Sequence, residues 1–395
     1  MGKESVKVGN GIVVSRRKGE EGGYVLITMA IAAFALVGVM GVAVDIGRMF
    51  IVKNETQAFC DAAALAASLQ LDGTTTGIAH AKTAVTNSTN TWNFNTATIS
   101  NPTVTFATTS AGPWVANPNP ATLYAYAQVS ATVSEQLYFI PVIVTQTTQN
   151  VVSAAIAGQV ALTNFPRGLA PYTAVSTNTT GPDFGLIVGN SYDIQWPQFS
   201  TLGTGGCTSG NPDACFNKPA CLGDPSASKL AVVSSWGSNT SGYWGSTSNN
   251  TIQQEILDLI QTASIDITNG PYNIQPVLSS GTKESEAGYL DQRASEDTDT
   301  TDNTPSDYFA AAHNGRRLLA VPVVDPVDAT HTNVIGFGQF LLLANGPGTS
   351  TYYQANSQGN SPYCAIYVGT YLVGGTGTGV PGVGSSGAVR VKLLQ

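Results

Sequence analysis

The fold is decided by residues 16–71, RRKGEEGGYVLITMAIAAFALVGVMGVAVDIGRMFIVKNETQAFCDAAALAASLQL. Inside this stretch, the 21 residues from Tyr24 to Val44 carry no charged side chain. As a helix they would be about 31 Å long, which is enough to cross the hydrocarbon core of a bilayer. Three basic residues at 16–18 precede the run, and such residues keep their flank of a first span in the cytoplasm. The sequence therefore predicts a membrane span with the rest of the chain outside the cytoplasm.

The predicted helix continues past the membrane to about residue 71. Between Asp45 and Leu71 there is no proline and only one glycine, and alanine is frequent, which favours helix. Apolar residues recur there at steps of three and four, so the extension has one apolar stripe that needs a partner surface. Small residues at Gly38, Gly41 and Gly47 would let another helix approach closely.

Two runs within this helix resemble a known family. They are Gly41-Val-Ala-Val-Asp45-Ile-Gly-Arg48 and Gln57-Ala-Phe-Cys-Asp61-Ala-Ala-Ala-Leu-Ala66. They are similar to the N-terminal segment of TadE/TadG-like proteins of the Flp (Tad) pilus assembly system, and a looser likeness extends to about residue 160 through Phe139-Ile-Pro141. The resemblance implies a pilin-like domain on an inner-membrane anchor, whose partners are other pilus or pilus-assembly subunits that contact the helix. Self-assembly through the same helix is a further implication.

The resemblance also bears on processing of the N-terminus. In TadE-like pseudopilins, prepilin peptidase cuts after a glycine, and a glutamate lies five residues beyond the cut. Here the fifth residue after Gly19 is Tyr24 and the fifth after Gly22 is Ile27. This departure favours the TadG-like branch, which is anchored by an uncut helix. A signal-peptidase cut after Ala43 is the alternative, although an apolar run of 21 residues is long for a signal peptide.

Charge is distributed unevenly along the chain. The formal net charge is −8, and only 11% of the residues are charged. Residues 1–60 contain seven Lys or Arg and five acidic residues, which leaves ten basic and twenty acidic residues for the remainder. The part outside the cytoplasm is therefore acidic, and binding of nucleic acid through a basic patch is not expected.

Alternating apolar and polar residues, as in 121–133, predict half-buried strands after the helix. Further strand patterns and two amphipathic helices follow a proline-containing segment. We predict an α+β fold: a long N-terminal membrane-spanning helix with a pilin-like antiparallel sheet, followed by a β-rich antiparallel α+β distal domain. The predicted parts are a cytoplasmic tail (1–23), the transmembrane helix (24–44), a pilin-like domain (45–163), a linker (164–182) and the distal domain (183–395).

Four of the five cysteines are expected to form two disulfides, because cysteines outside the cytoplasm usually pair. They are Cys207, Cys215, Cys221 and Cys364. Three connectivities are open, and we favour Cys207 with Cys215 and Cys221 with Cys364. A zinc site is the competing interpretation, but no histidine lies near these cysteines in the sequence. Cys60, on the helix, is either a small buried residue or a link between neighbouring helices.

Two segments contain oxygen ligands suitable for a metal. The acidic run at 296–303 contains Asp297, Asp299 and Asp302, which are weak candidates for Ca²⁺; a solvated acidic loop is the alternative. Asp224-Pro-Ser226-Ala-Ser228 matches a D-x-S-x-S metal-site pattern, but no apolar strand precedes it, so a turn is favoured. The sequence contains no G-x-S-x-G, P-loop, HExxH or CxxC motif. We therefore expect neither a cofactor nor catalysis.

Asp45 and Arg48 are three residues apart on the helix, at the expected outer boundary of the membrane. They either form an ion pair there, or Asp45 contacts a neighbouring subunit or the assembly platform, because a carboxylate beside lipid needs a partner.

Three functional hypotheses follow. The leading one is a membrane-anchored, non-enzymatic component of Flp pilus assembly or surface attachment, resembling a minor pilin. It would reside in the bacterial inner membrane, with the N-terminus cytoplasmic and the bulk of the chain periplasmic or at the cell surface. The first alternative is a major filament subunit. The second is an envelope glycan-binding or hydrolytic module in the distal domain, where aromatic residues would stack on sugars; these are Trp196, Trp236, Tyr243 and Trp244.

Overall fold

A computed structural model provides the structure of the chain. It describes residues 21–88, 99, 101–142, 144–172, 174–176, 178–194, 249–261, 264–274, 284–326, 332–343, 363–375, 377–383 and 386–394. The chain divides into two compact units, which we describe separately. The first comprises residues 1–59, 90–102 and 131–153, and the second comprises residues 60–89, 103–130 and 154–395.

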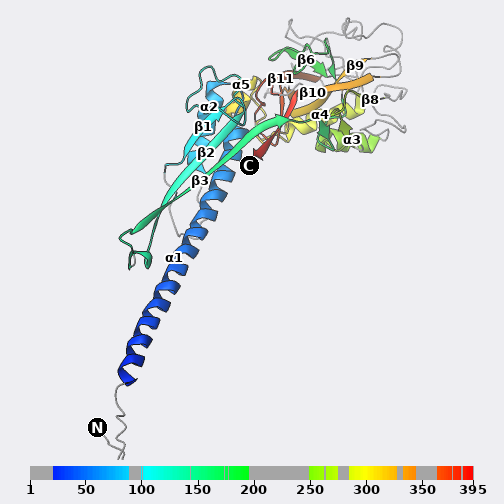
Figure 1. Ribbon diagram of the computed structural model, residues 1–395. Coiled ribbons are helices and arrows are strands. Elements are labelled where there is room, and N and C mark those ends of the chain that lie inside the picture. The colour runs from blue at the N-terminus through cyan, green and yellow to red at the C-terminus, as the bar shows by residue number, and fades with distance from the viewer. Residues whose placement is uncertain are drawn as a thin grey trace, which may run out of the picture. The chain divides into compact units, whose positions relative to one another are not determined.

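The long N-terminal helix α1 extends from Glu21 to Leu69, as the sequence predicts (Figure 1). Its N-terminal part is apolar. In the most apolar stretch of 18 residues the mean hydropathy is 2.5, and 6% of that stretch is buried. Among the described residues it is the one helix that is long and apolar enough to cross a membrane. The chain turns at Gly73, whose positive φ of 82° suits a residue without a side chain. Helix α2, Thr75–Asn87, then begins at Thr74, whose hydroxyl accepts a hydrogen bond from the backbone N–H of Gly77.

In the first unit, α1 packs against the end of a β-hairpin. The hairpin is formed by β2, Tyr126–Gln136, and β3, Thr148–Ala161, which lie side by side (Figure 1). Between them lies a short 3₁₀ turn, η1, Ile140–Val142. Val52 of α1 is buried against Val133 and Val151, one from each strand. The apolar stripe of the helix therefore meets the apolar side of the hairpin.

The second unit contains two larger sheets. The first has the order β1-β2-β3-β13-β12, with β1 at Thr103–Ala107, β12 at Tyr371–Val373 and β13 at Ala388–Leu394. Strand β2 alternates between buried and less buried residues, as its sequence pattern predicts. The C-terminal strand β13 pairs antiparallel with β3, so that Leu394 lies opposite Ile156, and parallel with β12. Strand β13 therefore lies in the same sheet as β1, although the two strands are far apart in the sequence.

The second sheet has the order β5-β9-β10-β11-β6, and β8 pairs with β10. Its strands are β5 (Ala174–Val175), β6 (Ser191–Ile194), β8 (Tyr272–Ile274), β9 (Leu318–Pro326), β10 (Thr332–Leu342) and β11 (Tyr363–Gly369). A separate small sheet pairs β4 (Asn164–Phe165) with β7 (Ile265–Asp266). Two strand pairs, β5 with β9 and β12 with β13, are parallel. The pairs β1–β2, β3–β13, β4–β7, β6–β11, β8–β10, β9–β10 and β10–β11 are antiparallel, as expected for this α+β fold.

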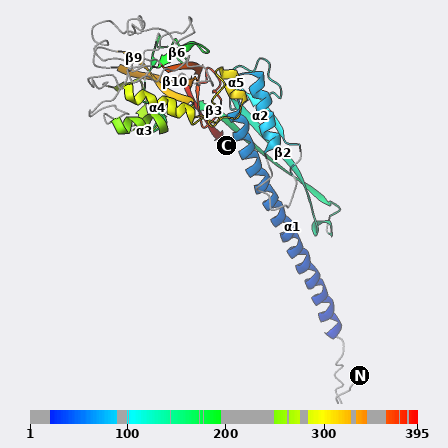
Figure 2. The ribbon, with the colours of Figure 1, turned by 180° about the vertical axis from the view of Figure 1, so that it is seen from behind.

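Helices cover part of this second sheet. They are α3 (Asn249–Asp258), α4 (Glu284–Ser295) and α5 (Pro305–Ala310). Helices α3 and α4 lie side by side in both views (Figure 2). Ile256 of α3 and Leu290 of α4 are buried in the main core together with Phe340 of β10. The two amphipathic helices predicted from sequence thus place their apolar residues in this core.

Residues 164–182, expected from their prolines to form a linker, are packed into the second unit. They contain β4 and β5, and Phe165 and Tyr172 are buried. The ring of Phe165 lies 4.2 Å, centroid to centroid, from that of Phe337 on β10. Burial of such aromatic residues stabilises the segment against the sheet, and the prolines interrupt it into short strands.

Candidate functional site

The region where α1 meets the hairpin contains the principal polar contacts of the first unit. Asp45 is buried, with 1% of its surface exposed. Its carboxylate accepts hydrogen bonds from three consecutive backbone N–H groups, at 3.1 Å from Tyr138, 2.8 Å from Phe139 and 2.8 Å from Ile140. These N–H groups lie at the start of η1, where a helical turn leaves its donors without internal partners. Asp45 therefore caps the turn and binds it to α1.

Arg48 binds the same hairpin at a second point. Its guanidinium lies 2.6 Å from the carboxylate of Glu135 and 4.5 Å from the ring centroid of Tyr138. Asp45 and Arg48 thus use partners on the hairpin. The ion pair of Arg48 is made with Glu135 rather than with Asp45, whereas a contact of Asp45 with another subunit stays a prediction.

At Gly41 the hairpin lies close against the helix. A Cβ atom at this position would lie 2.6 Å from the Cβ of Phe139, closer than real atoms approach. Glycine is therefore required for the hairpin to lie against the helix here. Gly38 and Gly47 have nothing within 4 Å of an added Cβ, so their role in contacts with another helix stays a prediction. Asp61 is half-buried, and its expected role in contacts with another helix also stays a prediction.

Lys53 extends this docking along the helix. Its ammonium group donates to the carbonyl oxygen of Val152 and to the hydroxyl of Ser153, the latter at 3.1 Å. Neither Lys53 nor Glu135 was predicted from the sequence to be functional. The run Phe139-Ile-Pro141 was part of the family resemblance, but nothing in it indicated which residues of the helix it would contact.

In the second unit, Gln159 of β3 is a further polar residue that the sequence did not single out. It is fully buried, and its amide group donates to the carbonyls of Ser68 at 3.0 Å and Leu71 at 2.7 Å. Its oxygen accepts from the N–H of Val380 at 2.8 Å. Because the last carbonyls of a helix lack internal partners, Gln159 caps the end of α1 and links it to the C-terminal segment.

The acidic run after α4 forms an internal hydrogen-bonding network. The carboxylate of Asp297 accepts from the hydroxyl of Tyr308 at 2.7 Å and from the backbone N–H of Arg317 at 2.8 Å. The guanidinium of Arg317, fully buried, donates to the carbonyl of Asp299 at 3.1 Å and to the side chain of Asn303 at 2.9 Å. Asp297 and Asp299 are buried, whereas Glu296 and Thr298 are exposed, so the run is solvated only in part.

The pKa values in this network follow from its contacts. Burial by itself raises the pKa of Asp297, but hydrogen bonds from Tyr308 and from backbone N–H groups together hold the pKa below its ordinary value. Burial and the neighbouring Asp299 carboxylate raise the pKa of Asp302. Within the described ranges, no group of three or more His, Cys, Asp or Glu side chains is arranged to hold a metal ion. A Ca²⁺ site at these residues therefore has no support from the geometry.

The cysteine predictions fall largely outside the described residues. Cys207, Cys215 and Cys221 lie there, as do the Asp224 motif and the four aromatic residues proposed to stack on sugars. Cys364 lies on β11, opposite Asp193 of β6. Cys60 is fully buried on α1. The disulfides and the glycan-binding module therefore stay predictions.

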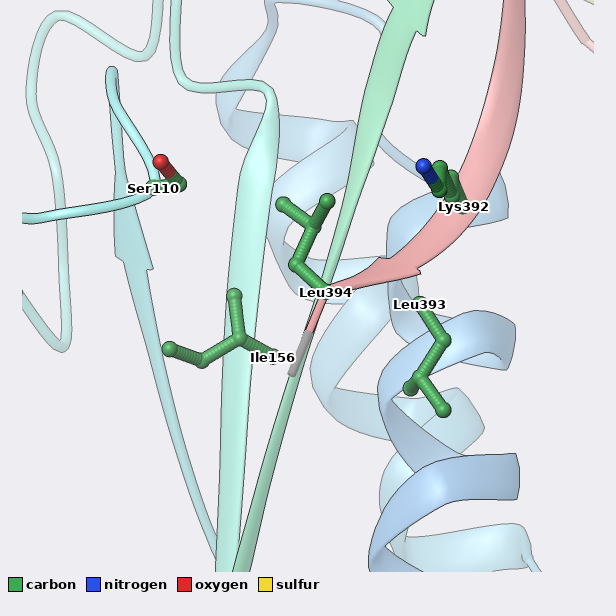
Figure 3. A pocket seen from close by; sticks show the side chains of 5 residues that line it. All are labelled: Ser110, Ile156, Lys392, Leu393 and Leu394. Carbon is green, nitrogen blue, oxygen red and sulfur yellow. The ribbon is translucent and has the colours of Figure 1, made fainter.

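A pocket of about 550 Å³ opens where the end of β13 pairs with the middle of β3 (Figure 3). Three of its lining residues come from β13, Ile156 comes from β3, and Ser110 follows β1. One lysine, one serine and three aliphatic side chains line it: Lys392, Ser110, Ile156, Leu393 and Leu394. This lining provides no pair of acid and base groups, so it does not suggest a reaction.

The described residues thus contain one helix that is long and apolar enough to cross a membrane, followed by a β-rich part. Residues 23–70, which are almost the whole of α1, match the family described as putative Flp pilus-assembly TadE/G-like. The N-terminal resemblance is thereby confirmed, and it links the chain to Flp pilus assembly. Comparisons with curated proteins and with solved structures return no match.

Proposed function

We propose that the chain is a membrane-anchored structural component of Flp pilus assembly or surface attachment, resembling a minor pilin and acting without catalysis. In this proposal α1 holds the chain in the inner membrane, with its N-terminus cytoplasmic. The hairpin and the second unit then lie on the outer side of that membrane. There the second unit presents a surface to other pilus or envelope components.

The observation that carries the proposal is the change in surroundings along α1. From Tyr24 to Met40 its large apolar side chains are exposed, including Phe34 at 74% and Leu36 at 64%. From Asp45 onward one side of the helix is buried against the hairpin, including Asp45 and Val52, whereas Ile46, Phe50 and Ile51 on its other side stay 43 to 65% exposed. An exposed apolar surface of this extent is costly in water, whereas lipid covers it without cost. The change occurs where the uncharged run ends, as expected for a span that continues into a folded external part.

The non-enzymatic role rests on the sequence, which contains none of the catalytic motifs named above. The membrane orientation is supported by the three basic residues at 16–18.

The test is fractionation of cells that produce the full chain, followed by alkaline carbonate extraction and intact-mass measurement. The proposal expects the chain in the carbonate-resistant membrane fraction with its full-length mass. A matched variant, Leu36→Arg with Val39→Arg, places two charges in the apolar run, where each costs about 3 kcal/mol at the centre of a span. It should leave the membrane fraction, whereas Gln57→Arg on the outer part of α1 should not.

Two results would overturn the proposal. Recovery of the full chain mainly in sheared surface filaments would identify a major filament subunit. Recovery as a soluble protein that lacks the apolar run would identify a cleaved, secreted protein.

A further inference from the structure

The loop that joins β2 to β3 has an unusual composition for a loop exposed to water. We call residues 137–144, LYFIPVIV, the hairpin tip. None of its residues is charged. Four of its large apolar side chains are exposed, by 42 to 71%: Tyr138, Phe139, Val142 and Val144. A cluster of this kind indicates a surface that another apolar phase or molecule covers.

The backbone of the hairpin tip is equipped for surroundings without water. In water, the N–H groups of a loop can bind solvent, but in hydrocarbon they must be satisfied by the protein itself. Each N–H in the described part of the tip donates within the protein, and Pro141 has none. The acceptors are the carbonyl of Thr147 for Leu137, the Asp45 carboxylate for Tyr138, Phe139 and Ile140, the carbonyl of Phe139 for Val142, and that of Ile140 for Val144.

The position of the tip along α1 sets its depth. The uncharged run ends at Val44, and Gly41, against which Phe139 packs, lies about 6 Å before Asp45 along the helix axis. Phe139 is therefore level with the outer edge of the hydrocarbon core. Tyr138 lies beside the guanidinium of Arg48, which follows Val44 by four residues, about one turn of helix. Aromatic and basic side chains gather at this level in membrane proteins.

We propose that the hairpin tip is a second membrane contact, inserted into the outer edge of the bilayer that α1 spans, with lipid covering its exposed apolar side chains. This inference rests on the proposed function, because it requires α1 to be a span. Lipid is the occupant because the tip is continuous with the exposed apolar surface of α1, through its contact with Gly41.

The arrangement also explains how a carboxylate is tolerated at the membrane boundary. An uncompensated Asp beside lipid is costly, but the tip gives Asp45 three N–H donors and excludes lipid and water from it. In return, Asp45 holds the tip at one height on α1. The two contacts together would fix the depth and rotation of the helix relative to the hairpin, which a single span leaves free.

The test uses the full chain in nanodiscs of phosphatidylethanolamine and phosphatidylglycerol, with or without brominated acyl chains. An environment-sensitive fluorescent amino acid replaces Val142 in the tip, Phe34 in the apolar run, or Val152 on β3. Val152 is a matched control, since it is also an exposed valine of the hairpin, at 55%. It lies beside Lys53, about 12 Å beyond Asp45 along the helix.

The proposal expects quenching by bromine and a blue-shifted emission at positions 142 and 34, and neither at position 152. If position 34 is quenched while position 142 behaves like position 152, the inference is wrong and the membrane anchor stands. A blue shift at 142 without quenching would mean that protein covers the tip, which also overturns the inference. If position 34 is not quenched, the proposed anchoring fails as well. Protection of the amides of residues 138–140 from hydrogen exchange confirms that each labelled chain keeps its hairpin docked.

Discussion

Two of the buried carboxylates, Asp45 and Asp297, are held in different ways. Asp45 accepts only from backbone N–H groups, and these lie 93 to 95 residues away in the sequence. Asp297 accepts from the Tyr308 side chain as well as from backbone, and its partners lie within 20 residues. Asp45 holds α1 against a hairpin that is distant in the sequence, whereas Asp297 stabilises the local connection between α4 and β9. Removing Asp297 should therefore loosen a core, and removing Asp45 should release a hairpin while leaving cores intact.

The largest effect is expected for Asp297→Ala. The substitution leaves the Tyr308 hydroxyl and the Arg317 N–H buried without their acceptor, and each such loss costs about 1–3 kcal/mol. We expect the free energy of opening of β9, measured by native-state hydrogen exchange on the full chain, to fall by roughly 3 kcal/mol. Asp302→Ala is the control, because Asp302 is only half-buried, and its effect should stay near 0.5 kcal/mol. Equal losses in the two variants would contradict this description of the network.

Asp45→Ala should act on the hairpin alone. The amides of Tyr138, Phe139 and Ile140 lose their acceptor, so their hydrogen exchange should accelerate while that of β9 stays unchanged. Asp61→Ala, the same change later on α1, should leave these three amides protected. Continued protection in Asp45→Ala would show that the hairpin is held by its side chains.

A smaller effect is expected for Gly41→Ala, because all hydrogen bonds to Asp45 remain possible. The added methyl group would lie 2.6 Å from the Cβ of Phe139, which no rotation of that side chain relieves. We expect docking of the hairpin to weaken by about 1–2 kcal/mol, as in other overpacked sites, measured as faster exchange of the amides of residues 138–140. Gly38→Ala adds the same methyl group where nothing lies within 4 Å, and it should leave the exchange unchanged.

A pH titration should separate the Asp297 network from the rest of the chain. The pKa of Asp297 lies below its ordinary 3.8, because its hydrogen bonds outweigh burial. The unfolded chain therefore takes up the proton first as the pH falls. The stability contributed by Asp297 is complete above the ordinary value and is lost as the pH falls through it toward the folded pKa. In Asp297→Asn, the opening of β9 should depend less on pH between about 5 and 2; an unchanged acid dependence would assign it to other carboxylates.

The smallest effect, none at all, is expected for calcium. Both oxygens of Asp297 already accept hydrogen bonds, and Oδ1 of Asp299 accepts from Thr301 and Asp302 in its own loop, which leaves only Oδ2 of Asp299 for a cation. Adding Ca²⁺ should therefore not change the thermal unfolding midpoint of the full chain, with Mg²⁺ as the control. A rise specific to Ca²⁺, lost in Asp299→Ala, would restore the calcium hypothesis.

Local patterns were sufficient for part of the candidate site. The Gly41 to Arg48 run and Phe139-Ile-Pro141 were both singled out from the sequence, and the structure brings them together. The pairing itself was not predicted. From the sequence, an ion pair of Asp45 with Arg48 and a contact of Asp45 with another subunit were both open. Folding gives Asp45 three N–H groups and gives Arg48 the carboxylate of Glu135.

The amino-acid sequence by itself determined α1, its uncharged run and the alternation of β2, because helix propensity, hydropathy and side-chain periodicity are local properties. Only the tertiary structure decided what Asp45 binds, that Arg317 is buried among acidic residues, and that β13 completes the first sheet. Each of these depends on the register and packing of segments far apart in the chain. A buried polar group takes whichever partner that packing brings within hydrogen-bonding distance.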